Sequence, residues 1–238
     1  MESIEKDQAS FAWFTRAWDD YTGGFPWLLP VLIVQTAATY GVFWLIHRYH
    51  SLTPAAAYML LVVTPLSTGA VLVYINMART GRARLRDLFS AFPVYHKALA
   101  INVGLGLMTL AGMLAFVLPG IVIYLTFCFS EYFLLDRGAG IKESFRLSGA
   151  LTLGWKTRLF PVLLLTILVN AAPDIAAISD PLKNPKVILD LRPWIITAAV
   201  LKTLVFLPWL NLAMARAYNF LLALPVPVPA AEQPQPEA

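Results

Sequence analysis

Long apolar runs recur along the chain and predict that most of it lies in a membrane. A helix needs about 20 apolar residues to span a bilayer, and six stretches reach or approach that length. They comprise residues 25–47, 55–78, 97–118, 120–136, 159–178 and 194–224. Each run is continuously apolar, which is typical of a membrane-spanning helix. We therefore predict an all-α fold, a polytopic membrane helix bundle with six transmembrane helices.

Shorter amphipathic segments precede each pair of spans. Apolar residues recur there at helical spacing, with charged residues on the opposite face. The three apolar sets are Phe11, Phe14, Trp18 and Tyr21, then Leu85, Leu88, Phe89 and Phe92, and last Ile141, Phe145, Leu151 and Trp155. We predict three interfacial helices on the cytoplasmic membrane surface, each followed by a hairpin of two spans. Their uneven spacing leaves two alternatives open. The three units form a true threefold internal repeat, or the same local arrangement occurs independently in three places.

These patterns divide the chain into three parts. They are a cytoplasmic amphipathic helix (1–24), a six-span membrane domain (25–224) and a disordered Pro-rich tail (225–238). Pro119-Gly120 predicts the tight turn between the third and fourth spans, since proline stops one helix and glycine permits the turn. Pro65 and Pro208 lie inside spans, where proline is expected to kink a helix.

Composition and charge agree with a membrane protein and give its orientation. The chain is 58% hydrophobic and only 13% charged, whereas a soluble domain carries about 25% charged residues. With the N-terminus inside, 13 of the 18 Lys and Arg residues lie on the inner side. Basic residues accumulate on the cytoplasmic side, so we predict that both termini are cytoplasmic. Candidate contacts for anionic lipid headgroups are Arg82, Arg84, Arg86, Lys142 and Arg146.

Charged residues within the predicted spans are candidate functional sites, because an intramembrane charge is costly and is often functional. They are Glu131, Asp174, Lys202 and Arg216. In the predicted topology Glu131 lies near Arg216 and Asp174 near Lys202, so each pair is a candidate ion pair. Snorkelling to the headgroups and a proton or substrate pathway are the alternatives. Four amides either bond between helices or line a polar cavity: Asn76, Asn102, Asn170 and Asn211.

The other chemistry-bearing residues give no constellation for catalysis. His47 and His50 have i, i+3 spacing, but no cluster of further ligands lies nearby, so we read them as an interfacial polar cap and not a metal site. Cys128 is the single cysteine. The sequence has no nucleotide-binding motif and no evident nucleophile and base. We therefore expect no enzymatic activity, no cofactor, no metal and no nucleic-acid partner.

One motif links the chain to a bacterial family. Its residues are Pro119-Gly120-Ile121, Tyr124, Phe129, Asp136, Gly138, Glu143-Ser144-Phe145, Ser148, Gly154-Trp155 and Ala217-Tyr218. In these residues the chain resembles a family of uncharacterised six-span inner-membrane proteins, which is related to the membrane domain of glycerophosphodiester phosphodiesterases. The specific motif covers about residues 119–155 and the likeness in architecture about residues 10–222. The resemblance implies an inner-membrane location and no established activity, since the phosphodiesterase chemistry belongs to a separate catalytic domain.

Two functions of different classes remain. The first is a non-enzymatic membrane protein that organises lipids or a partner membrane protein. The alternative is a small transporter or permease subunit, supported by the intramembrane charges. A polar cavity lined by Asn102, Asn170 or Asn211 would favour the transporter, and a closed apolar bundle with headgroup-facing surface helices would favour the organiser.

Overall fold

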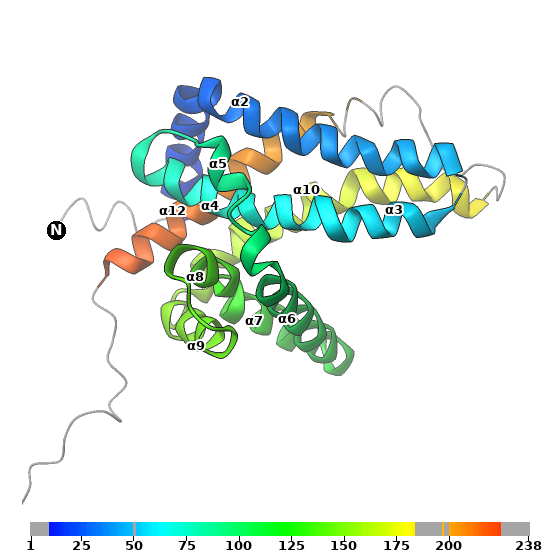
Figure 1. Cartoon of the computed structure of the whole chain (residues 1–238). Coiled ribbons are helices and arrows are strands. Elements are labelled where there is room, and N and C mark those ends of the chain that lie inside the picture. The colour runs from blue at the N-terminus through cyan, green and yellow to red at the C-terminus, as the bar shows by residue number, and fades with distance from the viewer. Residues whose placement is uncertain (1–9, 50, 184–196, 198–199, 225–238) are drawn as a thin grey trace, which may run out of the picture.

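The computed structural model describes residues 10–49, 51–183, 197 and 200–224, and every element in these ranges is a helix. The elements are α2 (Ser10–Tyr49), α3 (Leu52–Tyr58), the π-helix η1 (Met59–Val63), α4 (Thr64–Thr80), α5 (Leu85–Leu88), the 3₁₀-helix η2 (Phe92–Val94), α6 (Tyr95–Ala115), α7 (Val117–Phe127), α8 (Ser130–Arg137), α9 (Ile141–Leu151), α10 (Lys156–Lys183), the π-helix η3 (Lys202–Phe206) and α12 (Leu207–Ala223). Figure 1 shows α2, α3–α4 and α10 running side by side along one axis. The predicted all-α fold is confirmed for these residues.

Four helical stretches have the length and apolarity to cross a membrane. They are Phe11–Ile46, Thr53–Thr80, Leu85–Ala115 and Val117–Arg137. A bent pair, Ile141–Leu151 with Lys156–Val169, meets at 113° and raises the number to five if it forms one span. The four stretches correspond to the first four predicted spans. The chain is thus a multi-pass helical membrane protein, while the start of the predicted sixth span lies outside the described residues.

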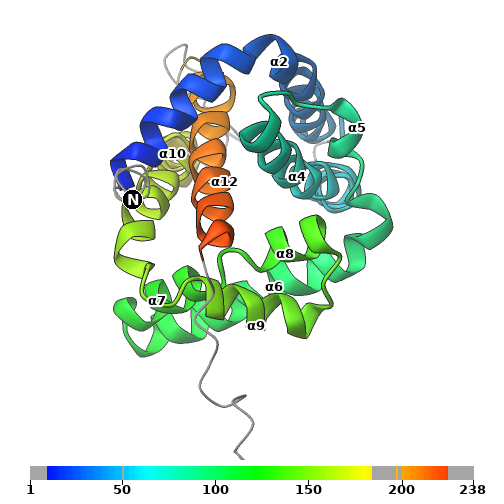
Figure 2. The same ribbon diagram turned by 90° about the vertical axis from the view of Figure 1, so that its left-hand side faces the viewer.

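Helix α2 joins the first predicted surface helix to the first predicted span. It is continuous from Ser10 to Tyr49 and changes direction along its length (Figure 2). The sequence placed Phe11 and Trp18 on the apolar face, but their side chains are 75% and 43% exposed, whereas Trp13 and Ala17 are buried. Tyr21, from the same predicted face, is buried as well. Exposed apolar side chains are also what an interfacial helix presents to lipid, so the predicted surface helix stays a prediction.

The turn between α6 and α7 differs from the predicted one. The chain reverses at Phe116, whose backbone is extended, and Pro119 and Gly120 lie inside α7. Gly120 serves close packing instead, because a Cβ there would lie 2.9 Å from the backbone nitrogen of Met113. Gly112 faces it across the same contact, as its added Cβ would lie 2.9 Å from the Cα of Gly120. The two glycines let α6 and α7 approach closely.

Helix geometry changes at the two prolines that were predicted to kink spans. Pro65 lies in the first turn of α4 directly after η1, and Pro208 lies in the first turn of α12 directly after η3. Proline has no N–H to donate within the helix, and π-helical turns accommodate such a break.

Helix α12 occupies the centre of the bundle (Figure 2). It packs against α2, α4 and α10. Alanines at positions 213, 215 and 217 are fully buried and keep its surface narrow, while Tyr218 is a large, fully buried side chain of the core. Small residues allow helices to approach closely, so α12 can contact helices on several sides.

Candidate functional site

A polar network joins the three helices α4, α8 and α12 at one end of the bundle. The guanidinium of Arg79 donates to both carboxylate oxygens of Asp136, at 2.5 and 2.8 Å, and its Nε donates to Oδ1 of Asn219 at 2.8 Å. The hydroxyl of Tyr218 donates to the same carboxylate at 3.1 Å. Bidentate guanidinium–carboxylate pairs fix geometry as well as charge, so this network sets how the three helices meet.

Local structure explains why Arg79 and Asp136 lie at corresponding positions. Each is two residues before the glycine that ends its helix, Gly81 after α4 and Gly138 after α8. Both glycines are left-handed, with φ of 70° and 64°, a conformation that glycine adopts without steric cost. The two side chains therefore project from the last turn of neighbouring helices.

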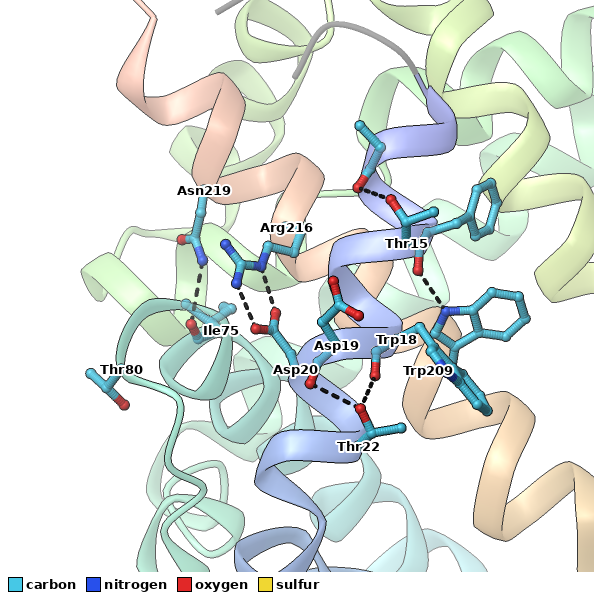
Figure 3. A network of polar contacts seen from close by, with 12 residues as sticks. Thr15, Trp18, Asp19, Asp20, Thr22, Ile75, Thr80, Trp209, Arg216 and Asn219 are labelled. Carbon is cyan, nitrogen blue, oxygen red and sulfur yellow. Dashed lines mark hydrogen bonds and ion pairs between the residues drawn. The ribbon is translucent and has the colours of Figure 1, made fainter. Parts of the chain in front are cut away.

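Arg216 forms a second bidentate ion pair, with Asp20 of α2. Its Nε and Nη2 donate to the two carboxylate oxygens at 2.5 and 2.6 Å (Figure 3). The sequence offered Glu131 as the partner of Arg216, and the structure gives Arg216 the carboxylate of Asp20 instead. Nearby, the amide of Asn219 donates to the carbonyl oxygen of Ile75 at 3.3 Å. Both contacts tie α12 to a neighbouring helix.

Glu131 lies where α4, α6 and α8 meet. Its carboxylate accepts from the amide of Asn102 at 3.2 Å, and the hydroxyl of Thr68 is hydrogen-bonded to it. Thr68 is buried, and Asn102 and Glu131 are half-buried. The group is a polar contact between three helices, held by one carboxylate.

The amides predicted in the spans bond between helices wherever their side chains are described. Asn76 donates to Asp87 of α5 at 2.8 Å, Asn102 donates to Glu131, and Asn211 is hydrogen-bonded to Tyr74 of α4. Asn170 has a side chain outside the described set. The sequence left two alternatives open for these amides, bonds between helices or the lining of a polar cavity. The contacts of these three amides match bonds between helices.

Of the two remaining charged residues predicted within the spans, the structure describes the side chain of one, Lys202. Lys202 begins the π-helix η3 and is half-buried. Asp174 lies in α10, but its side chain is among those not described, so its predicted pairing with Lys202 stays a prediction. The side chain of His47 is likewise not described. Within the described ranges, no three His, Cys, Asp or Glu side chains gather as metal ligands.

The five candidate headgroup contacts are all exposed. They are Arg82, Arg84, Arg86, Lys142 and Arg146. They come from the α4–α5 connection, α5 and α9, which lie toward the same end of the molecule (Figure 1). Arg82 also lies over the ring of Trp27, 5.5 Å from its centroid. An arginine beside an exposed tryptophan is typical of a membrane interface.

Sequence reasoning missed the ion pairs because it treated Arg79 only as a cytoplasmic charge and did not consider Asp20 or Asp136 as buried partners. The available signal was positional, since Arg79 and Asp136 each precede a helix-ending glycine by two residues. No protein-family model, curated protein or solved structure matches the chain. The case for a function therefore rests on these residues.

Proposed function

We propose that the chain is a six-span inner-membrane protein that organises anionic lipids, and through them a partner membrane protein, at the cytoplasmic face without catalysing a reaction. Both termini are cytoplasmic in this proposal. Its three surface segments, the first part of α2 (10–22), α5 and α9, then lie on the inner leaflet. The placement is supported by the excess of Lys and Arg assigned to that side, 13 of 18.

One observation carries the lipid-organising role: five exposed cations lie in segments at one end of the bundle. Each basic residue near an anionic membrane surface contributes about 1 kcal/mol of attraction. Arg82, Arg84 and Arg86 alternate along the α4–α5 connection and the start of α5, and Lys142 and Arg146 lie on α9. A surface of this kind favours phosphate-bearing, negatively charged headgroups over zwitterionic ones.

The polar residues inside the bundle support the same proposal. Arg79 and Arg216 each bind a carboxylate on another helix, and Glu131 is held by Asn102 and Thr68. These groups are used to join helices. A protein whose internal charges hold a bundle together, and whose exposed charges gather at one end, is suited to ordering lipids around it.

The lipids retained by the protein test the proposal. We would purify the full chain from nanodiscs of equal phosphatidylglycerol and phosphatidylcholine, and count the bound lipids by native mass spectrometry. The wild type should retain phosphatidylglycerol in excess, and R82Q/R84Q/R86Q should lower that preference at least tenfold, since about 3 kcal/mol of attraction is removed. The control is R48Q at the opposite end, which should change nothing. Equal retention of both lipids by the wild type would refute the role.

A transporter is the second candidate, and Glu131 is the observation that favours it. A carboxylate shared between three helices can take or release a proton and so change how those helices pack. The bonds from Asn102 and Thr68 would then differ between two states of the protein. The alternative requires that the negative charge of Glu131, and not only its hydrogen bonds, matters to the protein.

A further inference from the structure

Each of the three innermost helices, α4, α8 and α12, begins at a break in regular helix geometry. The π-helix η1 precedes α4 and the π-helix η3 precedes α12. Residues Cys128 and Phe129 interrupt the helix between α7 and α8. A break frees backbone carbonyl groups, which need hydrogen-bond donors in a membrane because water cannot supply them.

A hydroxyl from another part of the chain donates to a backbone carbonyl at each break. Near η1, the hydroxyl of Tyr95 donates to the carbonyl oxygen of Leu60, five residues before Pro65, at 2.5 Å. In η3, the hydroxyl of Tyr21 donates to the carbonyl oxygen of Leu204, four residues before Pro208, at 2.8 Å. Both prolines lack the N–H that could otherwise have bonded there.

The break between α7 and α8 has the same arrangement with different residues. The hydroxyls of Ser148 and Thr152, both from the α9 region, donate to the carbonyl oxygen of Thr126 at 2.9 and 3.1 Å. The Ser148 oxygen in turn accepts from the backbone N–H of Phe129 at 3.2 Å. All three breaks are therefore closed by side-chain hydroxyls.

The donors follow a cyclic order along three successive units, residues 10–80, 81–137 and 138–224. Tyr95 belongs to the second unit and bonds to the first, and Ser148 belongs to the third unit and bonds to the second. Tyr21 belongs to the first unit and bonds to the third. Each donor lies in or soon after the surface segment of its unit. The bond from the first unit to the third connects the three units in a ring.

Packing of the surface segments repeats this order. Segment α5 lies on α4, where Gly69 allows the carbonyl oxygen of Leu88 so near that an added Cβ would be 1.9 Å from it. Helix α9 packs on α8. The first part of α2 packs on α12, where the indole Nε1 of Trp209 donates to the carbonyl oxygen of Phe14 at 2.9 Å.

One buried tyrosine from each inner helix lies at a similar distance from the end of that helix, as expected if the three helices surround a common axis. Tyr74, Tyr132 and Tyr218 lie seven, six and six residues before Gly81, Gly138 and Leu224, which end α4, α8 and α12. All three belong to one core cluster, and the rings of Tyr132 and Tyr218 are 5.2 Å apart. The polar network of Arg79, Asp136 and Tyr218 lies at the same end of these helices.

We infer that the chain is a closed ring of three equivalent units, in which each surface segment docks on the inner helix of the preceding unit. The surface of α12 is then a docking site whose partner is the chain's own N-terminal segment, residues 10–22. Its contact with α12 closes the ring in the way that α5 contacts α4 and α9 contacts α8. This inference does not depend on lipid binding.

Hydroxyl removal at two junctions tests the ring. We would measure the Tm of the detergent-solubilised full chain carrying Y21F, Y95F or Y40F, the last being an exposed tyrosine. Y21F and Y95F should each lower Tm by about 2–4 °C, as expected for one lost hydrogen bond in a chain of this length, and Y40F should leave it unchanged. A Tm of Y21F equal to that of Y40F overturns the inference, because an N-terminal helix lying free on the membrane would not need the hydroxyl.

A circular permutant tests the equivalence of the units without removing a side chain. The new chain begins at Ala139 and joins the old ends through residues 225–238 and 1–9. Every unit would enter and leave the membrane on one side, so the permutant keeps the orientation of each helix. Its Tm should lie within a few degrees of the natural chain. A permutant that is degraded, or that unfolds about 10 °C lower, overturns the ring.

Discussion

Charged side chains within the helices are paired over long distances in sequence. Arg216 binds Asp20, which is 196 residues away, and Arg79 binds Asp136. Lysine would not replace either arginine, because an ammonium group cannot make two parallel bonds to one carboxylate. Periodicity places a residue on a face of its own helix but does not tell which helix lies opposite. For this reason the sequence found Arg216 as a site and named the wrong partner.

Glu131 can be tested by replacing it with glutamine and with leucine. Glutamine keeps an oxygen that accepts from Asn102 and Thr68, so E131Q should keep the Tm of the wild type and its lipid preference. Leucine leaves the amide of Asn102 without its acceptor, and E131L should lower the free energy of unfolding by about 1–3 kcal/mol. Thermal unfolding of the detergent-solubilised protein measures both.

The opposite pattern would favour the transporter. If E131Q unfolds as early as E131L, the protein requires the negative charge and not only the hydrogen bonds. The same conclusion would follow if E131Q left Tm unchanged but altered the growth of cells that depend on the protein. Unchanged Tm and growth together would leave Glu131 as a packing residue.

The helices themselves differ from the predicted segments in length more than in position. The predicted surface helix at residues 85–92 is a single turn, α5, because Ser90 bonds to the carbonyl oxygen of Asp87 at 2.6 Å and the chain turns there. Helix α2 continues through Gly23 and Gly24, so the first predicted surface segment and the first predicted span form one helix. Gly24 is buried against Met77, whose Cε would lie 2.3 Å from an added Cβ. Such contacts between distant helices are not visible in local sequence.

Close contact between α4 and α5 predicts the effect of a single methyl group. G69A places a Cβ 1.9 Å from the carbonyl oxygen of Leu88, and backbone must move to admit it. We expect a loss of about 1–3 kcal/mol in the free energy of unfolding. The matched control is G106A in α6, where an added Cβ meets nothing within 4 Å, and replacing a helical glycine by alanine should stabilise by up to about 1 kcal/mol.

Thermal unfolding of the two variants separates the effects. A lower Tm for G69A and an equal or higher Tm for G106A is the expected result. Equal shifts for both variants would mean that α5 does not rest on Gly69, and the junction between the first two units would lose its support.

At the scale of the whole molecule, the sequence predicted a helical membrane protein but did not predict that its first unit contacts its third unit. Apolar runs are sufficient to predict helical spans, since a bilayer tolerates few other structures. The three surface segments were predicted from their spacing, and the repeat was left undecided because the segments begin at uneven intervals. What joins them is the set of bonds from Tyr21, Tyr95 and Ser148 to carbonyl groups in other units. Those bonds depend on tertiary contacts and follow only from the structure.

The central claim is that all three surface segments lie on one face of the membrane, with Arg48 on the other. Single cysteines report this directly after the native thiol is removed by C128A. We would introduce T15C, R84C, K142C or R48C, four positions that are exposed in the structure. Intact cells and permeabilised cells would each be treated with a membrane-impermeant maleimide.

The account predicts that R48C is labelled in intact cells and that T15C, R84C and K142C are labelled only after permeabilisation. Labelling of T15C, R84C or K142C in intact cells, or labelling that divides these three between the two sides, would contradict it.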